Sequence, residues 1–265
     1  MRRLLTILVF LLPAPAVPDA ARDGPVHAGL LCLDAPYAAA ETGEARYLAD
    51  LLQDLRPTLA RHPALEAALE DLAPALCLAR EMGGAEGYFE PATMRIVLAR
   101  GHPRGLHQAI LLHELRHLEQ FARGFCPSDE LTMTEHARSV FALEADASAI
   151  SLLLAWDRLL DGDTAVWEAM LNWPSQTDIA VALAQEFFRS GDPAAMAAAA
   201  FAQWYESDER RERYYVAACS AYLDRNEIAH ALTPTGRLPA DFLDRLCLLP
   251  AGGGYPCIER KGGRR

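Results

Sequence analysis

Apolar positions recur at helical spacing along most of this chain. Residues 43–60 and 64–80 are predicted to be two helices, which end near Pro63 and Gly83. In the C-terminal half, helix breakers separate a further series of apolar segments: Gly162, Pro174, Gly191-Asp192-Pro193 and Pro234. The pattern therefore predicts a mainly α-helical protein.

One stretch alternates instead with the period of a β-strand. It covers residues 87–99. At its end the side chains alternate between two faces, with Met94, Ile96 and Leu98 on one and Arg95, Val97 and Ala99 on the other. Pro91 and its neighbours supply a turn before it. We expect a small β-hairpin here, which either packs against the core or offers an edge to an extended peptide. The predicted fold class is thus mainly α with a small β-hairpin or sheet.

A helix predicted over residues 109–123 carries two histidines on one side. Residues four apart on an α-helix lie about 40° from each other, so His113 and His117 share a face. The opposite face is apolar and consists of Leu111, Leu115, Leu118 and Ala122. Gly124 follows the last turn as the expected C-terminal cap.

The two histidines belong to the motif His-Glu-Leu-Arg-His, residues 113–117. Two neutral imidazole nitrogens and an adjacent carboxylate, Glu114, are the groups that a zinc-dependent hydrolase needs. The zinc lowers the pKa of its water toward about 7, and Glu114 accepts the water proton as general base. The motif predicts one Zn²⁺ ion per chain, bound by His113 and His117.

A catalytic zinc usually takes three protein ligands, and the third is expected on the next helix. That helix is predicted to run from a cap at Ser128 or Asp129 to Leu160, without internal Pro or Gly. The residues on it that could bind a metal are Glu135, His136, Glu144 and Asp146. Small neighbours on the face of Glu144 would let another helix approach closely. Glu144 is therefore the predicted third ligand, and Asp146 is the alternative.

With this motif followed by Glu144-Ala145-Asp146-Ala147, 27 positions after His117, the chain resembles the gluzincin branch of the zincin metallopeptidases. It is similar in particular to a group of exported bacterial proteins known only as metallopeptidase-domain proteins. The resemblance covers about residues 85–155. It implies a zincin-like core of an edge strand, an active-site helix and a second helix bearing the glutamate ligand. The implied activity is hydrolysis of peptide bonds in a peptide or protein substrate.

Two positions depart from that family pattern. Arg116 is charged where many gluzincins have an uncharged residue, and its place beside Arg123 predicts a surface or salt-bridge role. Ser148 stands where several have an aspartate four residues after the ligand glutamate. Aligning Asp146 to that aspartate instead would put Ala142 at the ligand position.

Peptide hydrolysis usually needs a further donor for the developing oxyanion. The candidates in the C-terminal half are Tyr205, Tyr214, Tyr215, Tyr222 and His230, and the sequence assigns the role to none of them. Two alternatives to a peptidase stay open. One is a non-catalytic periplasmic binding or structural protein with a zincin-like fold, and the other is a zinc hydrolase of non-peptide amide bonds.

The first residues have the pattern of a secretory signal peptide. Met1-Arg2-Arg3 precede an apolar run that ends at Leu12 and is followed by Pro13-Ala14-Pro15-Ala16. Cleavage is expected after Ala16, or else after Ala20 or Ala21. The apolar run is far shorter than the ~20 residues that span a bilayer, so no stable membrane anchor is expected. The mature chain is expected to be periplasmic or secreted.

After this segment, residues 22–250 are expected to form one metallopeptidase-like domain. Its core is placed at about residues 64–160 and its helical C-terminal extension at 161–250. Residues 251–265 are expected to be a flexible tail. The formal net charge of −11 argues against nucleic acid or anionic lipid as partners. Nothing in the sequence fixes the oligomeric state.

Six cysteines follow the signal segment: Cys32, Cys77, Cys126, Cys219, Cys247 and Cys257. An even number in an exported chain is compatible with up to about three disulfides. None of them has the C-x-x-C spacing of a cysteine-based zinc site. Cys247 and Cys257 close a short loop rich in glycine and proline, which makes them the favoured pair.

Overall fold

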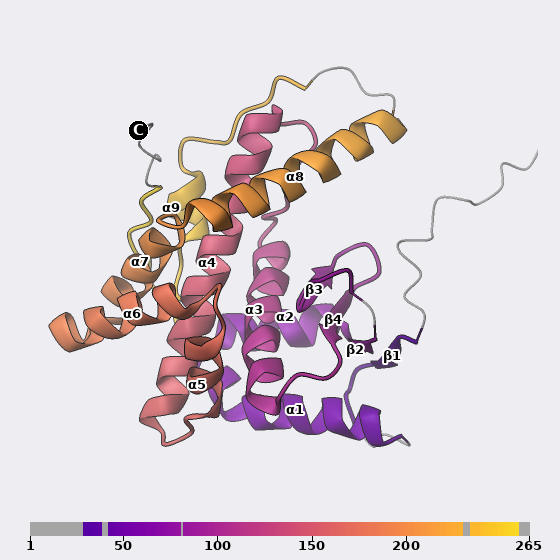
Figure 1. Cartoon of the computed structure of the whole chain (residues 1–265), viewed down its shortest axis with the longest axis vertical. Coiled ribbons are helices and arrows are strands. Elements are labelled where there is room, and N and C mark those ends of the chain that lie inside the picture. Colours follow the sequence, from indigo (N-terminus) through magenta and orange to yellow (C-terminus); the bar gives the residue numbers. More distant parts are fainter. Residues whose placement is uncertain (1–28, 39–41, 81, 230–233, 260–265) are drawn as a thin grey trace, which may run out of the picture.

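The structure is a computed structural model that describes residues 29–38, 42–80, 82–229 and 234–259. The predicted signal peptide (residues 1–21), His230 and the last residues, 260–265, lie outside the described residues. The described chain is mainly helical and carries one small sheet, so the predicted fold class is confirmed (Figure 1).

The sheet is four-stranded, with the order β1-β2-β4-β3. Its strands are β1 (Leu31–Leu33), β2 (Ala75–Ala79), β3 (Gly87–Glu90) and β4 (Arg95–Ala99). The two inner strands, β2 and β4, are parallel, and each outer strand is antiparallel to its neighbour. Strands β3 and β4 form the predicted hairpin, and β3 lies at the edge of the sheet.

The second predicted helix, residues 64–80, is wrong in its last third. Helix α2 spans Pro63–Leu72 and ends because Ala73 adopts a left-handed φ of 43° and Pro74 has no amide hydrogen to donate. The following residues, Ala75–Ala79, form strand β2 instead. Both faces of this strand are covered, so its apolar run lacks the alternation that would have distinguished it from a helix.

Helices α3 (Arg104–Ala122) and α4 (Met133–Leu160) form the centre of the molecule, and α1 (Gly43–Leu59) packs against their ends at its lower edge in Figure 1. The predicted leucine stripe of α3 is buried, but Ala122 at its end is exposed. Helix α4 begins after Thr132, whose hydroxyl accepts the Glu135 amide, rather than at a cap on Ser128 or Asp129. By length and composition α4 could cross a membrane, yet 83% of its most apolar window is buried inside the protein.

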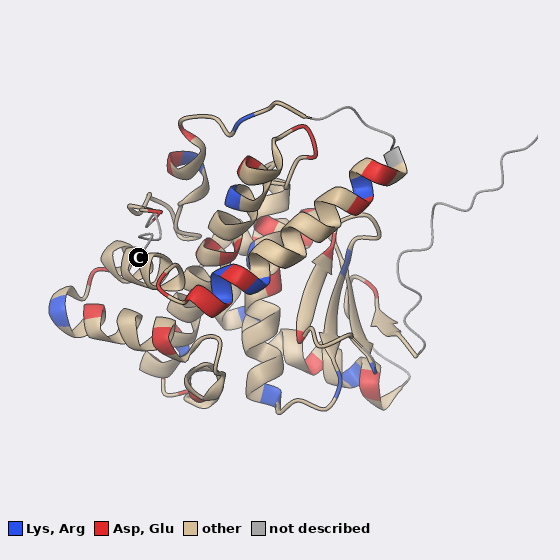
Figure 2. Cartoon of the chain, turned by 45° about the horizontal axis from the view of Figure 1, so that its top comes forward, with Lys and Arg blue, Asp and Glu red and all other residues tan. Residues whose placement is uncertain are grey.

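The remaining helices all pack against α4, and α5 also packs against α3. They are α5 (Ala165–Asn172), α6 (Thr177–Ser190), α7 (Pro193–Trp204), α8 (Asp208–Ala229) and α9 (Phe242–Leu246). The predicted breakers lie between them, and α7 starts at Pro193 with the Asp192 side chain as its cap. Helix α8 projects beyond α4 and passes above the sheet in the view of Figure 1. Acidic and basic residues are interspersed along its first turns (Figure 2).

The C-terminal residues are packed further than the sequence suggests. Tyr255 is only 5% exposed, and Cys257 is bonded to Cys247. Tyr255 and Cys257 are thus part of the packed structure, whereas residues 251–254 are exposed, and the favoured disulfide is confirmed. A second disulfide, Cys32–Cys77, joins β1 to β2. The last two cysteines, Cys126 and Cys219, form no disulfide within the described chain.

Candidate metal centre

Helices α3 and α4 pack against each other and bring His113, His117 and Glu144 together. The Nε2 atoms of the two histidines are 3.1 Å apart. Glu144 places Oε2 3.4 Å from Nε2 of His113 and Oε1 3.5 Å from Nε2 of His117. Asp146, the alternative third ligand, points away from this group. The three predicted ligands thus converge on one point, although Glu144 comes from a different helix.

The spacing of these atoms fits a tetrahedral metal ion. Ligand atoms around zinc, with bonds of about 2.0–2.1 Å, lie roughly 3.3–3.4 Å from one another. The chemistry of the donors fits as well, because two imidazoles and a carboxylate suit zinc better than a hard cation such as Mg²⁺. The two facing Nε2 atoms need a proton or a metal ion between them, since two lone pairs would repel.

Electrostatics keep Glu144 negative and favour a positive charge on or next to His117. Burial alone would raise the pKa of Glu144, but the neighbouring histidines lower it well below its usual value. Burial would lower the pKa of His117, yet the Glu144 carboxylate outweighs it and raises that pKa to about 9. The site therefore holds a strong negative potential that a divalent cation can satisfy in place of a proton.

Glu114 lies beside the histidines and is buried, with 5% of its surface exposed. Its carboxylate accepts a hydrogen bond from the backbone amide of Phe89 in strand β3. Burial raises the pKa of Glu114, the two histidines lower it, and the Glu144 charge raises it again. The net effect raises the pKa of Glu114, which makes its carboxylate a stronger base.

Strand β3 lies close to Glu114 because of a glycine. A Cβ added to Gly87 would overlap Cγ2 of Ile110 on α3 and would lie 3.5 Å from Oε1 of Glu114. The register of the hairpin, in which the Ala99 amide donates to Glu86, turns the backbone groups of Gly87 and Phe89 away from β4. The edge of the sheet therefore faces the candidate site.

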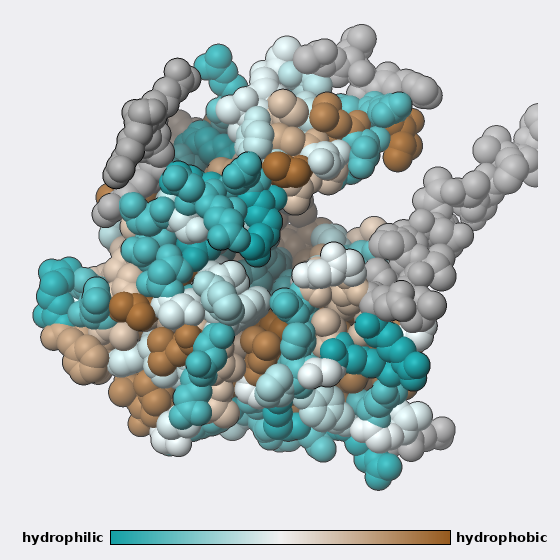
Figure 3. Space-filling model, viewed as in Figure 1, coloured by the Kyte–Doolittle hydropathy of each residue, from teal (hydrophilic) through white to brown (hydrophobic). Residues whose placement is uncertain are grey.

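A cavity of about 800 Å³ opens over the histidines, bounded by β3, α3, α4 and α8. Figure 3 shows the surface hollowed below α8, between that helix and the sheet. Apolar side chains line one part of it, among them Phe89, Phe121, Val140 and Leu143. Charged groups of α8, Glu209 and Arg213, lie at its wall. A cavity of this size accommodates several residues of an extended peptide.

Of the residues considered as oxyanion donors, only Tyr214 contacts the site among those the structure describes. Its hydroxyl makes a hydrogen bond to Glu144, and burial raises its pKa well above the usual value. Tyr215 is 45% exposed, Tyr222 donates to the Leu131 carbonyl, and Tyr205 lies in the core. No signal in the sequence separates Tyr214 from these, because the position of α8 over α4 is a tertiary feature.

The other candidate ligands on α4 have different partners. The carboxylate of Asp146 binds the Arg116 guanidinium through two bonds of 2.7 and 2.9 Å. Glu135 accepts the backbone amide of Leu238. His136 contacts the Ser128 carbonyl, 3.1 Å away. Arg116 thus has the salt-bridge role that was one of its two predicted roles, although it is fully buried.

Gln120 was missed by the sequence analysis. Its Oε1 lies 2.8 Å from Nδ1 of His117, one turn along α3. Residues three apart on a helix often contact each other, so the sequence spacing alone makes this contact possible. The sequence does not predict whether the Gln120 amide faces the histidine or solvent.

The fold and this group define a mainly α protein with a buried His-His-Glu cluster able to hold a metal ion. The chain belongs to the family described as "Putative metallopeptidase family (DUF6782)", whose model matches residues 21–257. Comparison with curated proteins finds no match, and comparison with solved structures finds none either. Family membership indicates a metal-dependent enzyme with a peptide or protein substrate. The disulfides indicate an oxidising compartment outside the cytosol.

Proposed function

We propose that this protein is an exported zinc metallopeptidase of the gluzincin type. His113, His117 and Glu144 hold one zinc ion, and Glu114 is the general base. The observation that carries this proposal is the convergence of three ligand atoms, 3.1–3.5 Å apart, beside a buried glutamate. In this proposal strand β3 has the role of the edge strand, α3 that of the active-site helix and α4 that of the glutamate-bearing helix.

When bound, zinc makes a water acidic enough to deprotonate near neutral pH and polarises the carbonyl to be cleaved. Glu114 accepts the proton of the attacking water at its carboxylate and then donates it to the leaving amine. The Phe89 amide holds the Glu114 carboxylate in place through its hydrogen bond. Because Glu114 is buried, bulk water does not compete for this proton.

The edge of β3 positions the substrate. The Gly87 backbone groups and the Phe89 carbonyl are directed away from β4, so an extended peptide can pair with these groups, while the Phe89 amide is bonded to Glu114. The Tyr214 hydroxyl, from the opposite wall, is the donor that we assign to the developing oxyanion. Its hydrogen bond to Glu144 keeps the phenol at the site before substrate arrives.

Metal content and peptide hydrolysis, measured together, test the proposal. The mature, disulfide-bonded wild type should contain about one zinc per chain and cleave some members of a peptide library. His113→Ala and Glu144→Ala should lose the zinc, whereas Glu114→Gln should keep it and lose activity. Glu135→Ala, on the same helix as Glu144 but bonded to Leu238, is the matched control and should keep both.

The outcomes separate the alternatives. Folded wild type without zinc would overturn the proposal. Zinc that is retained in Glu144→Ala would remove Glu144 from the ligand set. Cleavage of small amides in preference to peptides, still dependent on Glu114, would identify a non-peptide amide hydrolase. Bound zinc with no activity that depends on Glu114 would leave a binding protein.

A further inference from the structure

We propose that the C-terminal loop closed by Cys247–Cys257 stabilises the metal centre. The loop does so by fixing the orientation of the His117 imidazole through Asp146 and Gln120. The inference rests on the proposed function in that His117 is a metal ligand. Gln120, Asp146 and Arg116 are positioning residues here, because none of them touches the reacting atoms.

The first step is the bond between Gln120 and His117. The side-chain nitrogen of Gln120 donates to the Leu143 carbonyl at 3.0 Å and to Oδ2 of Asp146 at 2.6 Å. Neither partner can donate a hydrogen in return, so Oε1 of Gln120 must be the atom that faces His117. An amide oxygen only accepts, and Nδ1 of His117 must therefore carry the hydrogen of this 2.8 Å bond. When His117 is neutral, its lone pair is thereby placed on Nε2, where the metal would bind.

The second step is the set of donors around Asp146. An ionised carboxylate offers about four lone-pair positions. Four donors fill them: Arg116 Nε, Arg116 Nη2, the Gln120 amide and the Tyr255 hydroxyl. Asp146 and Arg116 are 0% exposed, and Gln120 is 1% exposed. This saturated carboxylate holds the Gln120 amide in one orientation and has no lone pair left for a metal.

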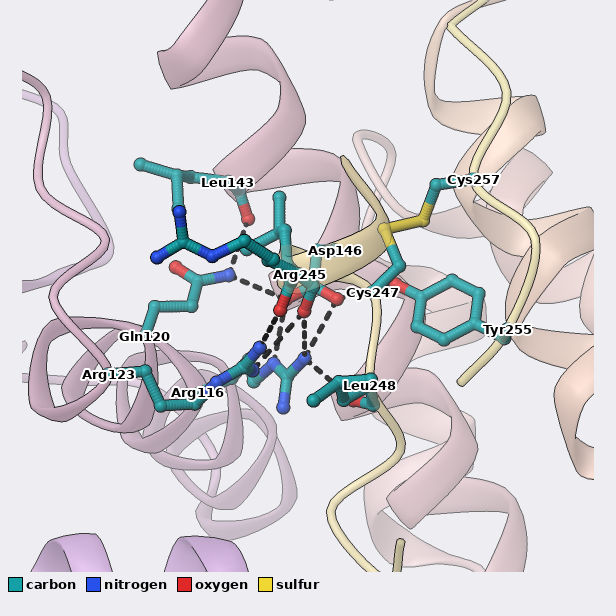
Figure 4. The surroundings of a disulfide bond; sticks show 11 residues. Arg116, Gln120, Arg123, Leu143, Asp146, Arg245, Cys247, Leu248, Tyr255 and Cys257 are labelled. Carbon is teal, nitrogen blue, oxygen red and sulfur yellow. Dashed lines mark hydrogen bonds and ion pairs between the residues drawn. A yellow bond between two sulfur atoms is a disulfide. The ribbon is translucent and has the colours of Figure 1, made fainter. Parts of the chain in front are cut away.

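The third step is the contribution of the C-terminal loop (Figure 4). Arg116 also donates to the backbone carbonyls of Leu246 and Leu248, the two neighbours of Cys247, at 3.4 and 2.9 Å. Tyr255, which donates to Asp146, lies two residues before Cys257. The disulfide closes this loop, so one covalent bond holds together the carbonyl and hydroxyl groups that fix the Arg116–Asp146 pair.

The support acts on one histidine only. Nδ1 of His113 is buried and has no hydrogen-bond partner among the described residues. The chain that runs from the disulfide loop to Gln120 therefore ends at His117. Loss of the loop would let water reach Arg116 and Asp146, would free the Gln120 amide to rotate, and would leave both tautomers of His117 accessible.

Zinc affinity and the tautomer of His117 are the readouts that test this inference. Gln120→Leu should weaken zinc binding by about 10- to 100-fold, the usual effect of losing the partner of a ligating histidine. At about pH 10, above the His117 pKa of about 9, long-range ¹H–¹⁵N NMR of the metal-free proteins should show the Nδ1–H tautomer of His117 in the wild type and a mixture in Gln120→Leu. Gln108→Leu is the matched control, because Gln108 is equally buried on α3 but donates to Asp54.

The disulfide is tested with a matched pair. Cys247→Ser/Cys257→Ser should weaken zinc binding about tenfold and shift the His117 tautomer. Cys32→Ser/Cys77→Ser, which removes the bond between β1 and β2, should leave both unchanged. If Gln120→Leu fails to fold, the comparison of the two disulfide variants still tests the inference. Equal zinc affinities in wild type and the Cys247/Cys257 variant would overturn the inference alone, whereas wild type that binds no zinc would overturn the proposed function with it.

Discussion

Arg116 donates through Nε and Nη2 to the two carboxylate oxygens of Asp146, at 2.7 and 2.9 Å, and both side chains are fully buried. Because both charges are removed from water, each needs a partner of opposite charge to offset its desolvation. Arg116 also pairs with Glu119 through Nη1 at 2.9 Å, whereas Arg116 is the cation that pairs with Asp146, so removing Arg116 would leave the Asp146 carboxylate buried without a counter-charge. The pair crosses between α3 and α4 directly behind the metal ligands, so its integrity also maintains the site.

Asp146→Ala should lower the free energy of unfolding by about 3–5 kcal/mol, because the buried Arg116 guanidinium would lose two charge-assisted hydrogen bonds and keep only Glu119 as a counter-charge. The double variant Arg116→Met/Asp146→Leu should lose less, since both charges of this pair are removed together and Glu119 keeps Arg123 as its partner. Urea denaturation of the metal-free proteins measures both. A double variant as unstable as Asp146→Ala would show that packing, not charge, is lost.

Gly87→Ala should lower stability and activity together. The new methyl group would overlap Ile110, and overpacking of this kind costs about 1–3 kcal/mol. It would also push β3 away from Glu114, which should reduce kcat/KM for peptides. Gly43→Ala is the control, because a Cβ there meets nothing within 4 Å. An unchanged kcat/KM in Gly87→Ala would show that the edge strand β3 does not bind the substrate.

Tyr214→Phe should reduce kcat by about 10²-fold, the usual effect of losing one oxyanion donor. The zinc content should stay the same, because Tyr214 contacts Glu144 but is not a ligand. The neighbouring Tyr215 is 45% exposed, so Tyr215→Phe should behave like wild type. Steady-state kinetics with a cleaved peptide checks this, and a Tyr214→Phe variant with full kcat would exclude the donor role.

Zinc should stabilise the folded chain because the site forms only when α3 and α4 pack together. At a free zinc concentration 100 times Kd, the free energy of unfolding should rise by about 2.7 kcal/mol. Thermal unfolding with and without a chelator measures this gain. A His113→Ala/His117→Ala variant should show none, and stabilisation of that variant by zinc would place the metal elsewhere.

Local features of the fold follow from the sequence. The four-residue spacing of His113 and His117 fixes their common face on any α-helix, and glycines and prolines mark most helix ends. Strand β2 could not be recognised, because Leu76, Cys77 and Leu78 are all buried and carry no alternation. The disulfide Cys32–Cys77 could not be predicted either, because it depends on the pairing of β1 with β2.

The sequence by itself therefore determined a histidine pair with its adjacent glutamate, since their relation depends only on helix geometry. Only the tertiary structure decided which carboxylate of α4 meets that pair. Glu144 and Asp146 point about 200° apart on one helix, and packing against α3 turns Glu144 to the histidines and Asp146 to Arg116. Tyr214 and the carbonyl of Leu248 arrive from distant parts of the chain. Their positions depend on how helices and loops pack in three dimensions, which no local spacing encodes.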